Sequence, residues 1–127
     1  MIFDGTPLSA LGPDGKTWFE PVWVATTFRT RLRGLSFTDP RPLGVLFPGC
    51  RSIHSHWMRY SLDVLFLAED GTVLRKSALR PWSGASHPQA ASILEIPCGF
   101  ADMGKLPDRL FWAPSPGSHK VLPILVE

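Results

Sequence analysis

The sequence predicts a mainly β fold, a compact single-domain sandwich or barrel-like sheet with one short helix after the first strand. Short apolar segments recur along the chain and turn residues separate them, since 13 prolines and 11 glycines occur among 127 residues. Apolar residues make up 44% of the composition and charged residues 19%, which is typical of a globular chain. A chain of this length can bury one hydrophobic core, so residues 1–127 are interpreted as one domain.

The first part of the chain is predicted to form an arm, a strand and the short helix. Residues 1–16 are rich in Gly, Pro and Asp and are interpreted as a loose N-terminal arm. Residues 17–25 predict a strand, and Pro21 places it at a sheet edge because proline cannot donate to a ladder. Residues 26–34 carry a threonine cap, apolar residues four apart and a terminal glycine, which predicts a helix of about two turns.

The rest of the chain predicts a series of short strands with one tight hairpin. Strands are expected at residues 44–47, 52–58, 62–68, 73–79, 92–96 and 110–112. Asp70-Gly71 predicts the hairpin turn, since this pair readily adopts the positive φ angles of a tight turn. Residues 80–89 are expected to form a long irregular loop, residues 100–106 one helical turn, and residues 113–127 a tail that packs back on the body.

The net charge and the length of the apolar runs argue against nucleic acids and membranes as partners. The net charge of +2, from 13 basic and 11 acidic side chains, is too small for the basic footprint of a nucleic-acid-binding protein. No apolar run reaches the roughly 18 residues that a membrane-spanning helix requires. The N-terminus also lacks the basic and apolar regions of a signal peptide, which predicts a cytoplasmic location. The expected partner is therefore an unidentified small ligand or protein.

Cys50 and Cys98 are the only cysteines of the chain. Two cysteines make neither a disulfide framework nor a paired zinc cluster, so both are expected to be buried thiols. A disulfide between them stays an alternative, because the sequence does not give their separation. A cysteine nucleophile with His54 as its base is a further alternative, although no recognised nucleophile motif surrounds either cysteine.

The motifs of the chain, taken in order, resemble those of one known family. They are Ala25-Thr26, Arg33-Gly34-Leu35, Ile53-His54, Trp57-Met58-Arg59, Leu62-Asp63-Val64-Leu65-Phe66, Asp70-Gly71-Thr72-Val73 and Ile93-Leu94-Glu95-Ile96-Pro97-Cys98-Gly99. In order and spacing, residues 22–112 resemble the domain of unknown function 192 family. The resemblance implies a compact, mainly β fold with a small helix after the first strand, and it implies no reaction. The chain departs from the family pattern at Ser36, where members often have methionine, and at Pro107, where many have glycine.

Two carboxylates, Asp63 and Glu95, interrupt apolar strand patterns. A buried carboxylate without a partner costs several kcal/mol, so each is expected to find a cation, a donor or water. Arg33 and Arg59 are the expected partners, since a guanidinium group can bind a carboxylate through two hydrogen bonds. The charges then either form a buried ion pair that fixes the helix onto the sheet or line a ligand pocket. In either case Asp63→Ala is expected to destabilise the fold by roughly 2–4 kcal/mol through an orphaned arginine.

His54 and His56 are two residues apart, a spacing that places both side chains on one face of a strand and can hold zinc, copper or nickel. Asp63, Glu95 or His87 would complete such a site, which would support a metal-assisted hydrolase. No third ligand has a diagnostic spacing, however, so neither a metal site nor a cofactor is predicted. The alternative is one histidine bonded within the sheet and the other at the surface.

The sequence contains no complete catalytic constellation, so the leading hypothesis is a non-catalytic module that binds a small ligand or a protein. The predicted ligand-binding residues are Arg33, His54, Met58, Arg59, Asp63 and Glu95. The metal-assisted hydrolase is one alternative, and a structural assembly protein that pairs through a sheet edge is another. Trp57 or Trp82, if exposed beside the 80–89 loop, would be a contact anchor for a partner.

Overall fold

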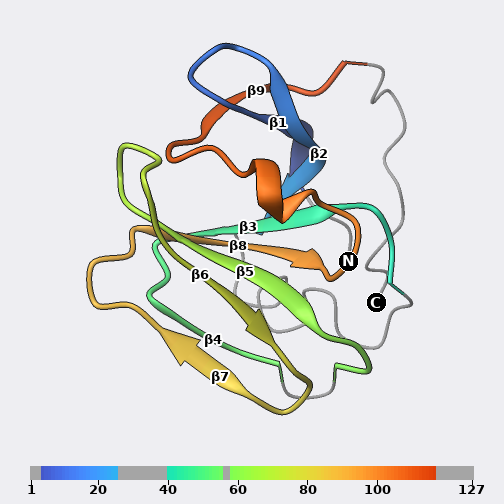
Figure 1. Ribbon diagram of the computed structural model, residues 1–127, viewed down its shortest axis with the longest axis vertical. Helices are drawn as coiled ribbons and strands as arrows, with labels where there is room; N and C mark the ends of the chain where they lie inside the picture. Colours follow the sequence, from blue (N-terminus) through green and yellow to red (C-terminus); the bar gives the residue numbers. More distant parts are fainter. Residues whose placement is uncertain (1–3, 26–39, 56–57, 117–127) are drawn as a thin grey trace.

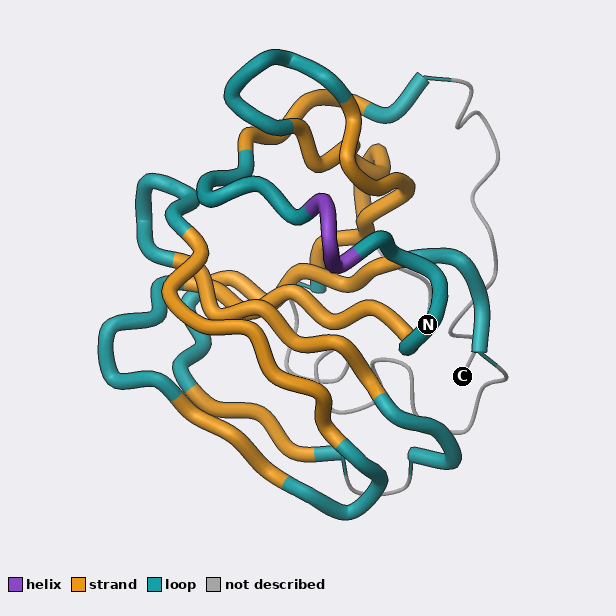
Figure 2. The backbone as a smooth tube through the Cα atoms, in the orientation of Figure 1, coloured by secondary structure: helices purple, strands orange, loops and turns teal. Residues whose placement is uncertain are grey.

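The computed structural model describes residues 4–25, 40–55 and 58–116, and strands form almost all of their regular structure (Figures 1 and 2). The strands are β1 (Asp4–Leu11), β2 (Thr17–Val24), β3 (Gly44–Pro48), β4 (Ser52–His54), β5 (Leu62–Leu67), β6 (Val73–Leu79), β7 (Gly84–Ser86), β8 (Ser92–Pro97) and β9 (Phe111–Pro114). Within the described ranges the only helical element is the 3-10 turn η1 (Met103–Lys105), drawn purple in Figure 2. The predicted mainly β class is therefore confirmed. None of the described residues belongs to a helix long and apolar enough to cross a membrane.

Seven strands form one mixed sheet in the order β6-β5-β8-β3-β2-β1-β9, and β4 pairs with β7 in a second, small sheet. The β2–β3 pair is parallel, and the other neighbours of the large sheet are antiparallel. In Figure 1, β1, β2 and β9 form the upper end of the molecule and β4 and β7 its lower end, with β3, β8 and β5 crossing between them.

The central strands of the large sheet bury apolar side chains on both faces. The cluster on one face, here the outer cluster, consists of Trp23, Ala25, Leu43, Val45, Phe47, Met58, Leu62, Val64, Phe66, Leu79, Ala90 and Ile93. The cluster on the other face, here the inner cluster, consists of Ala10, Phe19, Val22, Leu46, Leu65, Leu67, Leu94, Ile96 and Leu110. Ile53 of β4 and Ala85 of β7 pack against the outer cluster. The small sheet therefore covers part of the outer face.

A seam joins the two ends of the strand order and gives the sheet its barrel-like form. Thr72, which precedes β6, forms an antiparallel bridge with Arg109, which lies shortly before β9. The Val73 N–H donates to the Asp108 carbonyl at 2.9 Å, and the Leu110 N–H donates to the Gly71 carbonyl at 2.9 Å. Because β6 is the first strand of the sheet and β9 the last, these bonds draw the two ends together around the inner cluster.

Gly71 allows the close approach of the two segments that form the seam. Its φ is +90°, and a Cβ atom built on it would lie 2.1 Å from the Leu110 carbonyl oxygen. A larger residue would therefore be strained by its backbone and would also collide with the facing strand. The predicted turn at Asp70-Gly71 is confirmed, and the glycine serves the seam as well as the turn.

Two segments that the sequence predicted to be irregular contain strands. Residues 4–11 of the predicted arm form β1, which pairs with both β2 and β9. Residues 84–86 of the predicted 80–89 loop form β7, which pairs with β4. Both segments are rich in small or turn-forming residues, and their strand conformation depends on pairing with partners elsewhere in the chain.

The prediction that Pro21 marks an edge strand was wrong, because β2 lies between β1 and β3. The β1–β2 register shifts between the pairs Leu8↔Val22 and Ala10↔Phe19, which leaves one extra residue in β2. Proline is tolerated in such a bulge, where no regular ladder bond is needed. The helix predicted at residues 26–34 lies outside the described residues, as does the tail beyond residue 116.

Candidate functional site

Glu95 lies at the centre of the outer face of the large sheet. Strand β8 places it opposite Val45 of β3 and opposite Val64 of β5. Directly paired residues present their side chains on the same face, and both valines belong to the outer cluster. Trp23 of β2 pairs with Val45 and continues the row. The carboxyl group therefore lies in a row of apolar side chains.

The Glu95 side chain is only 5% exposed, and no described residue gives it a hydrogen bond or an ion pair. Burial raises its pKa from about 4.5 to about 8, because desolvation disfavours the charged form. At neutral pH the group is therefore mostly protonated. Buried polar groups are nearly always hydrogen-bonded, which makes Glu95 the first candidate for contact with a bound molecule.

Asp63 points to the opposite face of the sheet. It pairs with Ile96, a member of the inner cluster, so Asp63 and Glu95 cannot line one pocket. The Asp63 Oδ1 atom accepts a hydrogen bond from the Cys98 Sγ atom at 3.6 Å. Burial raises the pKa of Asp63, and the Cys98 bond partly opposes that shift. Within the described residues no arginine pairs with either carboxylate, so the expected contacts with Arg59 are not found.

The remaining predicted site residues do not form one cluster. Met58 is 6% exposed and belongs to the outer cluster, on the face that carries Glu95. His54 and Arg59 are exposed. His54 lies on the face of β4 that points away from the outer cluster, because its neighbour Ile53 packs against that cluster. Arg33 lies outside the described residues.

The described residues also do not assemble the histidine-based metal site that the sequence left open. Across residues 4–25, 40–55 and 58–116, no group of three His, Cys, Asp or Glu side chains could hold a metal ion. His56 lies outside these ranges. The His87 Nδ1 atom accepts a hydrogen bond from the Gln89 N–H at 3.2 Å, and its ring lies 6.2 Å from that of Phe66. His87 therefore helps to order its own loop.

Both cysteines are free thiols. Cys50 is half-buried, whereas Cys98 is exposed, so the expectation of two buried thiols was wrong for Cys98. Burial, together with the nearby Asp63 carboxylate, raises the pKa of the Cys98 thiol to about 11. A nucleophilic cysteine needs the opposite shift, because the thiolate is the reactive form.

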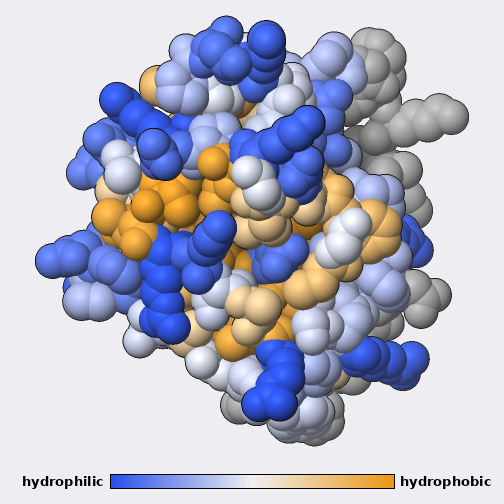
Figure 3. All heavy atoms as spheres, in the orientation of Figure 1, coloured by the Kyte–Doolittle hydropathy of each residue, from blue (hydrophilic) through white to orange (hydrophobic). Residues whose placement is uncertain are grey.

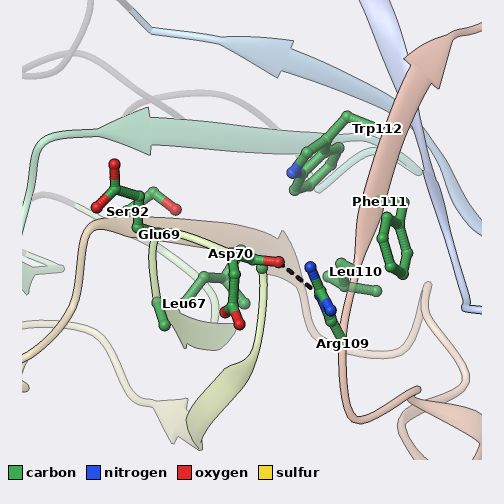
Figure 4. Close-up of a pocket in the computed structure, with 10 residues that line it drawn as sticks. Leu67, Glu69, Asp70, Ser92, Arg109, Leu110, Phe111 and Trp112 are labelled. Carbon is green, nitrogen blue, oxygen red and sulfur yellow. Dashed lines mark hydrogen bonds between the residues drawn. The ribbon is translucent and has the colours of Figure 1, made fainter.

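An open cleft at the seam was not predicted from the sequence (Figure 4). It has a volume of about 260 Å³ and is lined by the β5–β6 turn and the start of β9. The Arg109 Nε atom donates to the Asp70 carbonyl at 2.8 Å, and the Arg109 guanidinium lies 4.8 Å from the centre of the Phe111 ring. The Asp70 carboxylate accepts bonds from the Thr72 hydroxyl and N–H, which lower its pKa. Arg109 and Asp70 are thus already engaged within the seam.

A second open cleft, of about 270 Å³, lies between the β1–β2 turn and η1. There the Trp18 Nε1 atom donates to the Asp102 carbonyl at 2.9 Å. Neither of these two clefts contains a predicted site residue. Each joins segments far apart in the sequence, which no local motif could have signalled.

The comparisons by sequence point to one family. The family model DUF192, described as an uncharacterized ACR, matches residues 11–107. A UPF0127 protein of Thermococcus sibiricus is 32% identical over 112 residues, which cover 77% of this chain and 70% of the relative. A UPF0127 protein of Pyrococcus horikoshii is 31% identical over 106 residues, which cover 76% of this chain and 90% of the relative.

Two crystal structures share the fold. A proposed transcription regulator from Sinorhizobium meliloti has a TM-score of 0.73 at 23% identity, with 88% of this chain and 96% of that chain covered. A protein of unknown function from Novosphingobium aromaticivorans has a TM-score of 0.68 at 22% identity, with 84% of each chain covered. At these identities the likeness concerns the fold alone. The family model, which matches most of the chain, confirms the resemblance found in the sequence, and the protein belongs to the DUF192 family.

Proposed function

We propose that this chain is a non-catalytic module that binds a small polar ligand on the outer face of its large sheet, with Glu95 as the anchoring group. One observation carries the proposal. Glu95 is 5% exposed, and none of the described residues satisfies its carboxyl group. A well-packed apolar residue at this position would stabilise the fold more than a desolvated carboxyl group does. Retaining the carboxyl group therefore indicates a use other than stability.

The raised pKa of Glu95 limits which chemical groups of a ligand can complement it. With a pKa of about 8, the Glu95 carboxyl group is mostly neutral at pH 7 and can both donate and accept a hydrogen bond. A primary amide complements both functions, and an amine or amidine complements the ionised form. Val45 and Val64 flank Glu95, and the apolar cluster to which both valines belong favours an apolar body next to that polar group.

Fragment titration tests the proposal. The probes are benzamide, benzamidine and benzylamine, with benzoate as the control whose charge opposes binding. We expect at least one of the three probes to saturate at millimolar concentration and to move the carboxyl ¹³C NMR signal of Glu95.

Two variants sharpen that test. Glu95→Leu should weaken binding of that probe at least about tenfold. Glu95→Gln should still bind benzamide but should no longer prefer the cationic probes, benzamidine and benzylamine. The ligand-binding proposal fails if none of the three probes binds, or if Glu95→Leu binds them as well as the parent chain.

A further inference from the structure

The antiparallel ladder of the seam stops beyond Leu110, and the cleft that Arg109 borders opens where the ladder stops. If the register of the seam continued, Glu69 would lie opposite Trp112. The chain turns away instead, because the Gly71 N–H donates to the carbonyl of residue 68 at 2.9 Å and closes a tight turn. Since β9 is the last strand of the large sheet, the position beside Trp112 is left without a partner strand.

The main-chain N–H and C=O groups of Trp112 point away from β1. The Ser115 N–H donates to the Pro7 carbonyl at 2.9 Å, so these two residues form a hydrogen-bonded pair of the β1–β9 ladder. Such pairs alternate with non-hydrogen-bonded pairs, and by this alternation Ala10 and Trp112 form a non-hydrogen-bonded pair. The Leu110 N–H, two residues before Trp112, indeed reaches across the seam. The described residues therefore offer neither main-chain group of Trp112 a partner on this edge.

Arg109 lies beside this strand edge, and its guanidinium group is held in place. Its Nε atom donates to the Asp70 carbonyl, and the Phe111 ring lies against the guanidinium. Figure 4 shows the group between these two residues at the border of the cleft. Neither contact uses the two terminal nitrogens, and no described residue forms an ion pair with Arg109. A guanidinium oriented in this way can bind a carboxylate at a small further cost in side-chain freedom.

Acidic side chains nearby limit the charge of a ligand. Glu69 lines the same cleft and is exposed. The hydrogen bonds from Thr72 lower the pKa of Asp70, so its carboxylate is ionised at neutral pH. Both carboxylates would repel a dianion such as phosphate, whereas a monoanion can place its single charge on Arg109. The cleft is therefore suited to a monocarboxylate.

The cleft also offers apolar contact. Leu67 and Leu110 line it, are each 1% exposed and belong to the inner cluster, so this part of the lining is firmly packed. On the left of the visible face in Figure 3, where Figure 1 places the β5–β6 turn beside the segment before β9, strongly hydrophilic residues lie directly against apolar ones. A ligand in this cleft therefore meets charged, main-chain and apolar groups at once.

We propose that the seam cleft binds a carboxylate with a neighbouring secondary amide and an apolar side chain, the chemistry of an N-acylamino acid or of the carboxyl-terminal residue of a peptide. The ligand adds one antiparallel residue to the edge of β9. Its amide N–H donates to the Trp112 carbonyl, and one of its carboxylate oxygens accepts from the Trp112 N–H. This orientation points the carboxyl end of the ligand towards the start of β9, where Arg109 binds the other carboxylate oxygen.

Pro114 limits how far a ligand can extend along this edge. It is the next residue whose main chain faces away from β1, and proline has no N–H to donate. Recognition is therefore concentrated on the one residue beside Trp112. This site is separate from the proposed ligand site, because Glu95 does not line the seam cleft.

An NMR titration of the full chain with N-acetylleucine tests the proposal. We expect saturable amide shifts at residues 69–71 and 109–112, with the largest shift at the Trp112 N–H. Two analogues are the ligand controls, since N-acetylleucine amide lacks the carboxylate and 4-methylpentanoate lacks the amide. Each analogue should bind at least about fivefold more weakly, because each loses one set of hydrogen bonds.

Hydrogen exchange tests the bond to the strand edge directly. Exchange of the Trp112 amide hydrogen should slow at least about threefold when N-acetylleucine saturates the chain. The Ala113 amide hydrogen, which points to β1, should exchange at an unchanged rate. Glu95→Leu should bind N-acetylleucine as the parent chain does, so the outcome here is independent of the site at Glu95.

Three variants test the charges of the cleft. Arg109→Gln should weaken binding of N-acetylleucine at least about tenfold. Lys16→Gln, which removes an exposed cation from the second cleft, is the matched control and should leave binding unchanged. Glu69→Gln should strengthen binding of the dianion N-acetylaspartate about two- to fivefold. Glu69 is exposed, so this third variant remains informative even if Arg109→Gln weakens the seam.

The tripeptide acetyl-Ala-Ala-Leu with a free carboxylate distinguishes the two sources of this chemistry. Binding at least about tenfold tighter than that of N-acetylleucine assigns the cleft to a peptide terminus, and equal or weaker binding assigns it to a free N-acylamino acid. The proposal is overturned by the absence of shifts at residues 69–71 and 109–112 at about 20 mM N-acetylleucine. Analogues that bind as tightly as N-acetylleucine, or an unchanged exchange rate of the Trp112 amide at saturation, would overturn it as well.

Discussion

The two faces of the large sheet are built from the same strands but differ in the side chains of their central rows. On the inner face, Leu46, Leu94 and Leu65 form an uninterrupted apolar row across β3, β8 and β5. On the outer face, the neighbouring row carries Glu95 between Val45 and Val64. The inner row contributes only packing, whereas the outer row retains a buried carboxyl group that lowers stability. Both faces therefore hold the fold together by apolar packing, and of these two rows the outer one carries the buried carboxyl group.

The largest expected change in the free energy of unfolding comes from a substitution in the inner row. Leu94→Ala should lower the free energy of unfolding by about 2–5 kcal/mol, because it removes buried methyl groups and leaves a cavity. Glu95→Leu, the adjacent residue on the opposite face, should raise it, since an apolar side chain replaces a desolvated carboxyl group. Urea denaturation measures both values. Equal losses in the two variants would mean that the faces do not differ as described.

A somewhat smaller effect should appear in the pH dependence of stability. The pKa of Glu95 is raised from about 4.5 to about 8 on folding, so between these values the folded chain holds a proton that the unfolded chain has released. Stability contributed by this group is therefore present at low pH and is lost as the pH rises. The loss between pH 5 and pH 8 should be roughly 3 kcal/mol.

Denaturation of Glu95→Gln over the same pH range provides the control for that dependence. The glutamine side chain does not titrate, so the slope of stability against pH between pH 5 and pH 8 should become markedly flatter. A slope that is unchanged in Glu95→Gln would assign the dependence to other groups.

The smallest effect is expected at Asp63. Its partner is the Cys98 thiol and not an arginine, and it is half-buried near the start of β5. Asp63→Ala should therefore change the free energy of unfolding by less than about 1 kcal/mol, since a weak hydrogen bond is lost and no buried cation is orphaned. This value replaces the larger loss that the sequence suggested. Thermal and urea unfolding of the variant would contradict the structure if they returned a loss of several kcal/mol.

Strand positions with strong apolar patterns could be predicted from the sequence, whereas strands that depend on distant partners could not. Residues 62–68 and 92–96 are apolar on both faces, and both form central strands, β5 and β8. The Asp70-Gly71 turn was also predictable, because its residue types favour one backbone geometry. Strand β1 contains Gly5 and Pro7 and lacks a clean alternation, so its pairing with β2 and β9 was invisible in the local pattern.

The candidate site was predictable only in part, for a reason of register. Asp63 and Glu95 were both recognisable as carboxylates that interrupt apolar strands. Whether they share a face depends on how β5 and β8 align, and Asp63 pairs with Ile96 rather than with Glu95. A shift of one residue would exchange the two faces, and the local sequence does not fix the alignment of two distant strands.

The seam between Thr72 and Arg109 also bears on how the protein is made. A nascent chain cannot form this junction until residues 109 and 110 have left the ribosome, although β5, β6 and β8 emerge earlier. Until then the apolar side chains of the future barrel interior and an unpaired strand border are accessible to other molecules, the situation in which chaperones protect newly synthesised proteins. Synthesis of the first hundred residues therefore leaves a sheet that is still open.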